Sequence, residues 1–240
     1  MVARRAIWGK HPIDGSLVES SLSLWPPHRR SDLPPRKPIR SVAMKRTRRP
    51  ASKIEKPIPD FSRRPHRVHL EQVVEVTGFS KLKLRPIRLD DESKMVEFHR
   101  CISPKSVVLR YFGYLGLDRR TSHERLVRVC TNTSEVYSVV IEQPAHPRRA
   151  VAILAVGRLI KTPEPYVAMF DMLIGDEDNI PKLGAILLNR LISLGRAFHF
   201  QILAGKFLGI DKDAINLCRS LDFAVQDINE EGVVQALIRL

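Results

Sequence analysis

Residues 150–160 read AVAILAVGRLI, an almost wholly apolar run. A strand with one face in water alternates apolar and polar side chains, but this run is apolar at both parities. We therefore predict a central strand whose two faces are both covered. Such a strand requires a sheet with helices on each side, so this segment restricts the fold to layered α/β or α+β architectures.

The segments around this run alternate between strand and helix patterns. From Lys81 onward, short β-type runs are separated by amphipathic segments that begin with capping signals. The order predicts a mixed central sheet with helices on both faces. The predicted strands are residues 81–88, 135–142, 150–160, 166–174, 200–205, 223–227 and 233–240, and the predicted helices are residues 90–100, 103–112, 121–130, 181–197 and 212–220.

Particular residues specify the first two helix starts. Asp90 is a candidate N-cap, and Asp91 and Glu92 follow in the first turn, where the helix dipole favours negative charge. Ser103 supplies a capping hydroxyl, and Pro104 suits the first helical position because its missing N–H is harmless there. Both helices are thus predicted to lie between the first two strands of the domain.

The first third of the chain differs in composition from the rest. Residues 1–80 contain 17 Lys or Arg and 7 Asp or Glu, a net charge of +10 out of +14 for the whole chain. They hold most of the prolines and show no apolar period, so they cannot bury enough apolar surface to offset their ordering entropy. We predict a disordered basic arm over residues 1–80 and a folded domain over residues 81–240.

Cysteine usage and hydropathy predict a soluble, cytoplasmic protein. Cys101, Cys130 and Cys218 are odd in number, widely spaced and without a CxxC pattern, so neither a disulfide framework nor a zinc site is expected. The sequence has no run of about 18 apolar residues and no secretory signal at its N-terminus.

The remaining polar clusters show no pattern of a site. His99 and His123 have no partner at metal-ligand spacing, so both are interpreted as surface or packing residues, and no metal is predicted. The stretch RRTSHER at residues 119–125 is interpreted as a solvated loop.

Several stretches resemble one known family. LRPIRLDDE at 84–92, MVEFH at 95–99, SPKSVVLRYF at 103–112 and HERL at 123–126 are similar to the opening segment of GNAT acetyltransferases. The likeness is strongest to the acetyltransferase domain of bacterial protein lysine acetyltransferases that modify acyl-CoA synthetases, and it covers about residues 81–225. It implies the GNAT fold and an N-acyltransferase that moves an acetyl group from acetyl-CoA to an amine, with a protein lysine among the acceptors.

The resemblance also places the co-substrate. In this family acetyl-CoA lies where two parallel strands diverge, and its pyrophosphate rests on backbone N–H groups at the start of the next helix. The corresponding strand residues here are Met172, Leu173 and Ile174. Asp211 stands where the family commonly has an asparagine near the pantetheine.

The phosphate loop departs from the family's pattern of Gln or Arg, two residues, Gly, one residue, then Gly or Ala. Asn179, Lys182 and Gly184 occupy those three places, with Leu183 and Ala185 beside them. A lysine in place of the first glycine hinders close approach of the backbone to phosphates, but its ammonium can pair with one. The alternative is that Lys182 is a solvated residue at a helix start.

Two residues are candidates for proton transfer. The family's base is a glutamate, and that position is Met169 here. Asp171 lies two residues on and points to the same face of the strand, so it is the candidate replacement. Cys218 stands where the family often has a tyrosine that acts as the general acid and protonates the departing thiolate. The alternatives are a hydrogen-bonding structural role for Asp171 and a small core residue for Cys218.

Three hypotheses of function therefore stand. The first is an acetyl-CoA-dependent N-acetyltransferase, and the second is a non-catalytic descendant that senses acyl-CoA or binds a protein partner. The third is nucleic-acid binding through the basic arm, for which a solubilising tail is the favoured alternative. The acyl acceptor and the oligomeric state are left open by the sequence.

Overall fold

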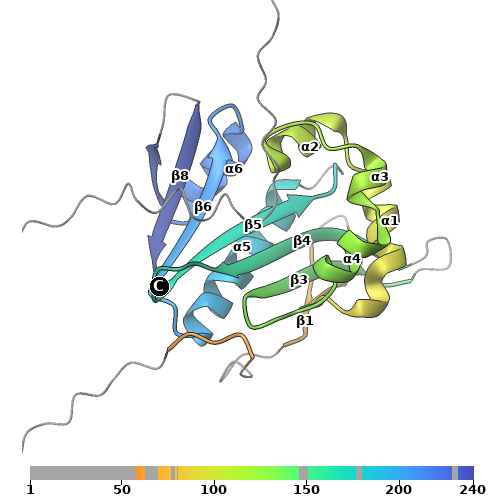
Figure 1. Ribbon diagram of the computed structural model, residues 1–240, viewed down its shortest axis with the longest axis horizontal. Helices are drawn as coiled ribbons and strands as arrows, with labels where there is room; N and C mark the ends of the chain where they lie inside the picture. Colours follow the sequence, from red (N-terminus) through yellow and green to blue (C-terminus); the bar gives the residue numbers. More distant parts are fainter. Residues whose placement is uncertain are drawn as a thin grey trace, which may run out of the picture. The chain divides into compact units, whose positions relative to one another are not determined.

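The computed structural model describes residues 58–62, 70–76, 79, 81–145, 151–176, 180–228 and 232–240. Within these residues, eight strands form one mixed sheet with helices on both faces (Figure 1). The predicted fold class is confirmed. Of the predicted disordered arm over residues 1–80, residues 1–57, 63–69, 77, 78 and 80 lie outside the described residues, whereas residues 58–62, 70–76 and 79 are described.

The strands lie in the order β1-β2-β3-β4-β5-β6-β8-β7. All neighbours are antiparallel except β5 and β6, which are parallel. The strands are β1 (Gln72–Val74), β2 (Leu82–Pro86), β3 (Val136–Gln143), β4 (Ala152–Lys161), β5 (Val167–Ile174), β6 (Ile202–Leu208), β7 (Ala224–Asp227) and β8 (Val233–Arg239), and the helices are α1 (Glu92–Arg100), α2 (Pro104–Tyr111), α3 (Leu117–Arg120), α4 (His123–Val129), α5 (Ile180–Ala197) and α6 (Lys212–Ser220).

The compact unit begins upstream of Lys81, the predicted start of the domain. It runs from Pro57 to Leu240. Phe61 is 5% exposed and its ring centroid lies 4.9 Å from that of Phe198 in an edge-on contact. Strand β1 pairs with β2 at the sheet edge. A three-residue strand and a single aromatic residue are too short to produce a periodic pattern, which is why composition placed the boundary later.

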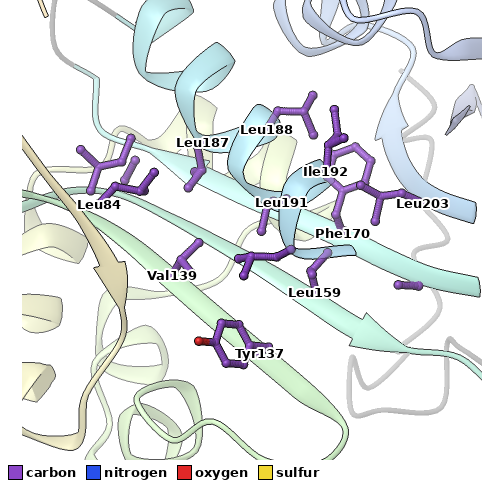
Figure 2. Close-up of a cluster of buried hydrophobic side chains, with 14 of the residues drawn as sticks. Leu84, Tyr137, Val139, Leu159, Phe170, Leu187, Leu188, Leu191, Ile192 and Leu203 are labelled. Carbon is purple, nitrogen blue, oxygen red and sulfur yellow. The ribbon is translucent and has the colours of Figure 1, made fainter. Parts of the chain in front are cut away.

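Strand β4 is central, as its apolar sequence predicts. Ala155 and Leu159 belong to the core under α5, which also contains Leu187 and Leu191 of that helix (Figure 2). Val156 belongs to a second core, on the face covered by α1–α4. Because both faces of the strand are buried, a run of polar side chains would be unfavourable on either face.

A buried ion network joins the start of α1 to the sheet. Arg85 on β2 is 1% exposed and binds Asp91 with two hydrogen bonds of 2.7 Å. Its Nε also donates to Glu142 on β3. Lys94 lies 3.1 Å from Asp91 and 3.2 Å from Glu142. Asp90, the predicted N-cap, is exposed, so the carboxylate that organises this helix start is that of Asp91.

Hydrogen bonding to Asp91 outweighs its burial. Burial favours the protonated acid, but hydrogen bonds from Arg85, from the Arg88 backbone N–H and from Lys94 lower the pKa of Asp91 to about 2. The pKa of Glu142 is lowered as well, because the hydrogen bonds from Arg85 and Lys94 outweigh its burial.

Asp91→Asn should destabilise the domain by about 3 kcal/mol, because it removes one charge from a buried pair and leaves Arg85 with a single carboxylate. Asp90→Asn is the matched control, since Asp90 is its exposed neighbour and should change stability by no more than about 0.5 kcal/mol. Chemical denaturation measures both. Equal stabilities for the two variants would contradict a stabilising role for the network.

The same network sets a pH dependence. The pKa of Asp91 is lower in the folded state than its unfolded value of about 3.9, so the folded state binds fewer protons. Its stabilising contribution is therefore complete above about pH 5 and is lost as the pH falls towards 2. We expect the denaturation midpoint to fall over this range more steeply in the wild type than in Asp91→Asn.

Candidate active site

Strands β5 and β6 are paired over only part of their lengths. Their parallel register ends at Met169↔Ala204, yet β5 continues to Ile174 and β6 to Leu208. Past that point β5 remains paired with β4, and β6 with β8. The two strands therefore diverge towards their C-terminal ends (Figure 1), and their facing edges share no ladder there. The predicted divergence of two parallel strands is thus present in the fold.

The diverging half of β5 presents different chemistry on its two faces. Met172 and Ile174 are half-buried against the core under α5, and Leu173 is buried in the core under α1–α4. Asp171 alternates with these residues, so it shares the α1–α4 face with Leu173. The three predicted cofactor positions on this strand thus lie in its diverging half, but not all on one face.

Aromatic rings pack beside the divergence on the α5 face. Phe170 is 2% exposed, and its ring centroid lies 5.9 Å from that of Phe207 and 5.5 Å from that of Phe223. A Cβ atom added to Gly205 would lie 2.5 Å from Cζ of Phe170. The absence of a side chain at Gly205 therefore makes room for this ring, and packing occupies the α5 face at the start of the divergence.

Helix α5 starts shortly after β5. Asn179, the first predicted phosphate contact, lies outside the described residues. Lys182 is exposed in the first turn of α5, and Leu183 is 1% exposed in the core. The backbone N–H groups that a helix leaves free belong to its first residues, and Pro181 has none. Lys182 therefore combines a backbone donor with a charged side chain at this end of the helix.

Gly184 lies at the contact of three elements. A Cβ atom added there would lie 2.9 Å from Leu217 on α6 and 3.1 Å from Ile174 on β5. Its neighbour Ala185 is half-buried on the same helix. Close packing of α5 against α6 and β5 is thus sufficient to explain the glycine, so its presence is not by itself evidence of a phosphate contact.

Asp176 ties the end of β5 to the start of α2. Its carboxylate accepts hydrogen bonds from the backbone N–H of Ser103 and from the hydroxyls of Ser103 and Ser106. The Ser103 hydroxyl also accepts the N–H of Ser106 at 3.2 Å, as the predicted N-cap of α2. The residues of α2 are therefore held over the diverging half of the sheet, where α2 contacts β5 and β6.

Asp171 is held in an ion pair. Its Oδ2 lies 2.5 Å from Nη2 of Arg110 on α2 and 4.0 Å from Nη1 of Arg158 on β4. Arg158 is the residue directly opposite Asp171 in the β4–β5 ladder. Met169 lies on the same strand and the same face, two residues earlier. A proton acceptor at Asp171 thus shares its carboxylate with two arginines.

Two other predicted site residues belong to α6 and its N-cap. Cys218 has none of its surface exposed, and burial, followed by the charge of Asp211, raises the pKa of its thiol to about 12. These facts favour a packing role for Cys218. Asp211 caps α6, since its carboxylate accepts the N–H of Ala214 at 3.1 Å. Burial raises the pKa of Asp211.

The burial of Arg120 differs from its sequence interpretation, whereas that of His99 agrees with the packing role that was one of its two alternatives. Arg120, assigned to a solvated loop, is 7% exposed and donates to the carbonyls of Leu115 and His99. His99 is 3% exposed, and burial and three arginine charges lower its pKa to about 4. The sequence of a short helix does not indicate that one of its arginines is buried. The burial of Arg120 follows only from the packing of α1 against α3 and α4.

The described part of the chain has no helix with the length and apolar character needed to cross a membrane. The same residues include no group of three or more His, Cys, Asp or Glu side chains arranged to hold a metal ion.

Comparison with solved structures identifies the fold. The chain resembles the GNAT domain of S. lividans PAT with a TM-score of 0.62 and 19% identity, over 72% of this chain and 98% of that domain. It resembles Mycobacterium smegmatis RimJ in complex with CoA-disulfide with a TM-score of 0.53 and 9% identity, over 70% and 86% of the two chains. For spermidine N-acetyltransferase from Vibrio cholerae in complex with CoA and spermine, the TM-score is 0.50 and the identity 16%, over 66% and 95%.

The chain therefore has the fold of the GNAT acetyltransferases, as its opening segment predicts. No family model matches the sequence.

Gly205→Ala should destabilise the domain by about 1–3 kcal/mol, because the new methyl group must displace the packed Phe170 ring. Gly113→Ala is the matched control, since nothing lies within 4 Å of a Cβ atom added there. Thermal or chemical denaturation measures the difference. A Gly205→Ala protein as stable as Gly113→Ala would show that the ring moves freely.

Proposed function

We propose that this protein is an acyl-CoA-dependent N-acyltransferase that moves an acetyl group from acetyl-CoA to an amine. The observation that carries the proposal is the divergence of β5 and β6 past Met169 and Ala204, followed directly by the N-terminus of α5. Two of the similar structures, RimJ and the spermidine acetyltransferase, contain CoA or its disulfide.

The diverging edges suit the pantetheine arm. Past Met169, the edge of β5 that faces β6 has no ladder with it, and the amides of pantetheine can pair with such an edge as an added strand would. The helix start then offers backbone donors and a positive dipole end to the diphosphate. Lys182 adds an exposed ammonium at the same place. Because the rings around Phe170 fill the α5 face of β5, the acyl group is placed on the opposite face of the strand, which carries Asp171.

Asp171 is the proposed proton acceptor. The attacking amine must lose a proton before or as its nitrogen bonds to the thioester carbonyl, and the C–S bond then breaks to release CoA thiolate, which takes up a proton. Asp171 lies on the diverging strand, on the face opposite the packed rings. Its pairing with Arg110 means that the amine competes with a guanidinium for the same oxygen.

A non-catalytic acyl-CoA-binding protein is the second candidate function. It is favoured by two observations: Asp171 is ion-paired, and Cys218 is fully buried with a raised pKa. This candidate retains the CoA site but predicts no turnover.

Lys182→Ala should weaken acetyl-CoA binding about three- to tenfold, because one exposed charge pair with a phosphate is lost. Lys81→Ala, an exposed lysine before β2, is the control and should leave the affinity unchanged. Isothermal titration with acetyl-CoA measures both. Absence of any binding to the wild-type protein would overturn both candidate functions.

Asp171→Asn should lower kcat about 100-fold or more, with acetyl-CoA affinity unchanged, because a proton acceptor typically contributes that much. Asp118→Asn, an exposed carboxylate on α3, is the control. Release of the CoA thiol with a panel of amines and lysine peptides is the measurement. An unchanged rate would remove Asp171 from the reaction, and no release with any amine would favour the non-catalytic candidate.

Nucleic-acid binding through the basic arm is a separate hypothesis, and the fold decides how to test it. A deletion of residues 1–80 would also remove β1 and Phe61, which belong to the folded unit. Deletion of residues 1–56 stops at the start of that unit. Equal affinity for DNA before and after this shorter deletion would exclude the hypothesis.

A further inference from the structure

Arginine side chains gather on the face of the sheet that carries Asp171. Arg110 lies on α2, Arg120 on α3, Arg125 on α4 and Arg158 on β4. Arg110 and Arg158 approach the same oxygen of Asp171, at 2.5 and 4.0 Å. Four separate elements therefore place guanidinium groups in one region, which local sequence cannot arrange.

The ring of Tyr111 contacts two of these arginines. The guanidinium carbon of Arg110 lies 5.1 Å from the ring centroid, and that of Arg125 lies 5.4 Å from it. Such cation–π contacts hold a guanidinium in place without neutralising its charge. Both groups also act on His99, whose pKa is lowered by burial and by the charges of Arg120, Arg125 and Arg110.

The positive charge in this region exceeds the negative charge that pairs with it. Among the described residues, Asp171 is the one carboxylate that forms ion pairs with these four arginines. Arg120 donates hydrogen bonds from its Nε and Nη1 atoms to the backbone carbonyls of Leu115 and His99. The buried Nε atoms of Arg125 and Arg158 and the buried Nδ1 atom of His99 have no hydrogen-bond partner in the described part of the chain. The two arginine Nε–H groups are buried donors without partners, which is costly, and an anion that accepts from them recovers that cost.

The position of the arginines separates them from the phosphate end of acetyl-CoA. The proposed diphosphate site is at the start of α5, which covers the opposite face of the sheet. Arg110, Arg125 and Arg158 lie instead on the α1–α4 side, where the acceptor must approach Asp171. The Arg110–Asp171 ion pair is enough to attach α2 to β5. A purely structural role therefore does not explain why Arg125 and Arg158 also lie in this region with unpaired Nε atoms.

We propose that the acyl acceptor is a small amine that carries an anionic group, a carboxylate or a phosphate, and that Arg110, Arg125 and Arg158 bind this group. The inference rests on the proposed function and names its substrate class. Because Arg110 and Arg158 both lie within 4.0 Å of Asp171 Oδ2, the anionic group and the nitrogen are separated by a few bonds.

The arrangement couples recognition to catalysis. When the acceptor's anionic group binds, Arg110 exchanges Asp171 for the acceptor. The Asp171 carboxylate oxygen is then free to accept a hydrogen bond from the amine and to take its proton as the nitrogen bonds to the acyl carbon. An amine without an anionic group leaves the Arg110–Asp171 pair intact, so it competes for an occupied carboxylate.

The test compares four acceptors of similar length with acetyl-CoA: O-phosphoethanolamine, β-alanine, ethanolamine and 1,3-diaminopropane. We expect kcat/KM for the two anionic amines to exceed that for ethanolamine at least tenfold, with the diamine lowest. The first two compounds distinguish phosphate from carboxylate recognition. Equal kcat/KM for all four, or a preference for the diamine, would overturn the inference and leave the proposed function standing.

Variants assign the effect to the arginines. Arg125→Gln and Arg158→Gln should each lower the ratio of kcat/KM for anionic to neutral amines at least tenfold, with KM for acetyl-CoA unchanged. Arg128→Gln, an exposed arginine on α4, is the control and should keep the wild-type ratio. If Arg158→Gln does not fold, Arg158→Lys is used in its place. Because lysine retains the positive charge, this variant should keep the selectivity for anionic amines. A uniform loss with every amine would indicate a structural role and overturn the inference.

Calorimetric titration of O-phosphoethanolamine into the protein with CoA separates the two proposals. Binding that Arg125→Gln abolishes, without turnover of any amine, would support the anion site and overturn the proposed catalysis. Turnover of neutral amines without binding of O-phosphoethanolamine or of β-alanine, titrated in the same way, would overturn the inference alone. Neither binding nor turnover would overturn both.

Discussion

The arrangement of the molecule depends on where β5 and β6 stop pairing with each other. Both strands keep complete ladders with their outer neighbours, β4 and β8, past Met169 and Ala204. The sheet therefore remains continuous while β5 and β6 separate in its middle. Past this point the backbone N–H and C=O groups on the two facing edges do not hydrogen-bond to each other. Helix α5 follows β5 in the chain, and α2 contacts both β5 and β6, so both helices lie beside the opening. A sheet closed at this point would have no edge to offer a pantetheine arm.

Charged and polar groups position the layer that covers this opening. Asp176 binds the first turn of α2, and Asp171 binds Arg110 near its end, so the helix is tied to β5 at two places. A different network holds α1, where Arg85 binds Asp91 and Glu142 inside the fold. In both places the contacts join side chains from different elements, so they fix the position of a helix on the sheet as well as neutralising charge.

The extent to which the sequence predicts this fold differs between its parts. The strand and helix ranges follow the sequence because apolar periodicity is a local property, and the apolar run in β4 required cover on both faces. Phe61 and β1 escaped prediction because their contribution depends on distant partners, Phe198 and β2. Ser103 caps its helix as expected, whereas the organising carboxylate of the first helix is Asp91, because a buried arginine from β2 competes for it.

The sequence by itself determined the order of the elements, the central strand and the likeness to GNAT acetyltransferases, since each depends on residues close together in the chain. Only the tertiary structure decided which side chains share the candidate site. It paired Asp171 with Arg110, buried Cys218, and gathered arginines from α2, α3, α4 and β4 on one face. The physical reason is that charge and burial depend on neighbours in space, and these neighbours are separated by up to about sixty residues of chain.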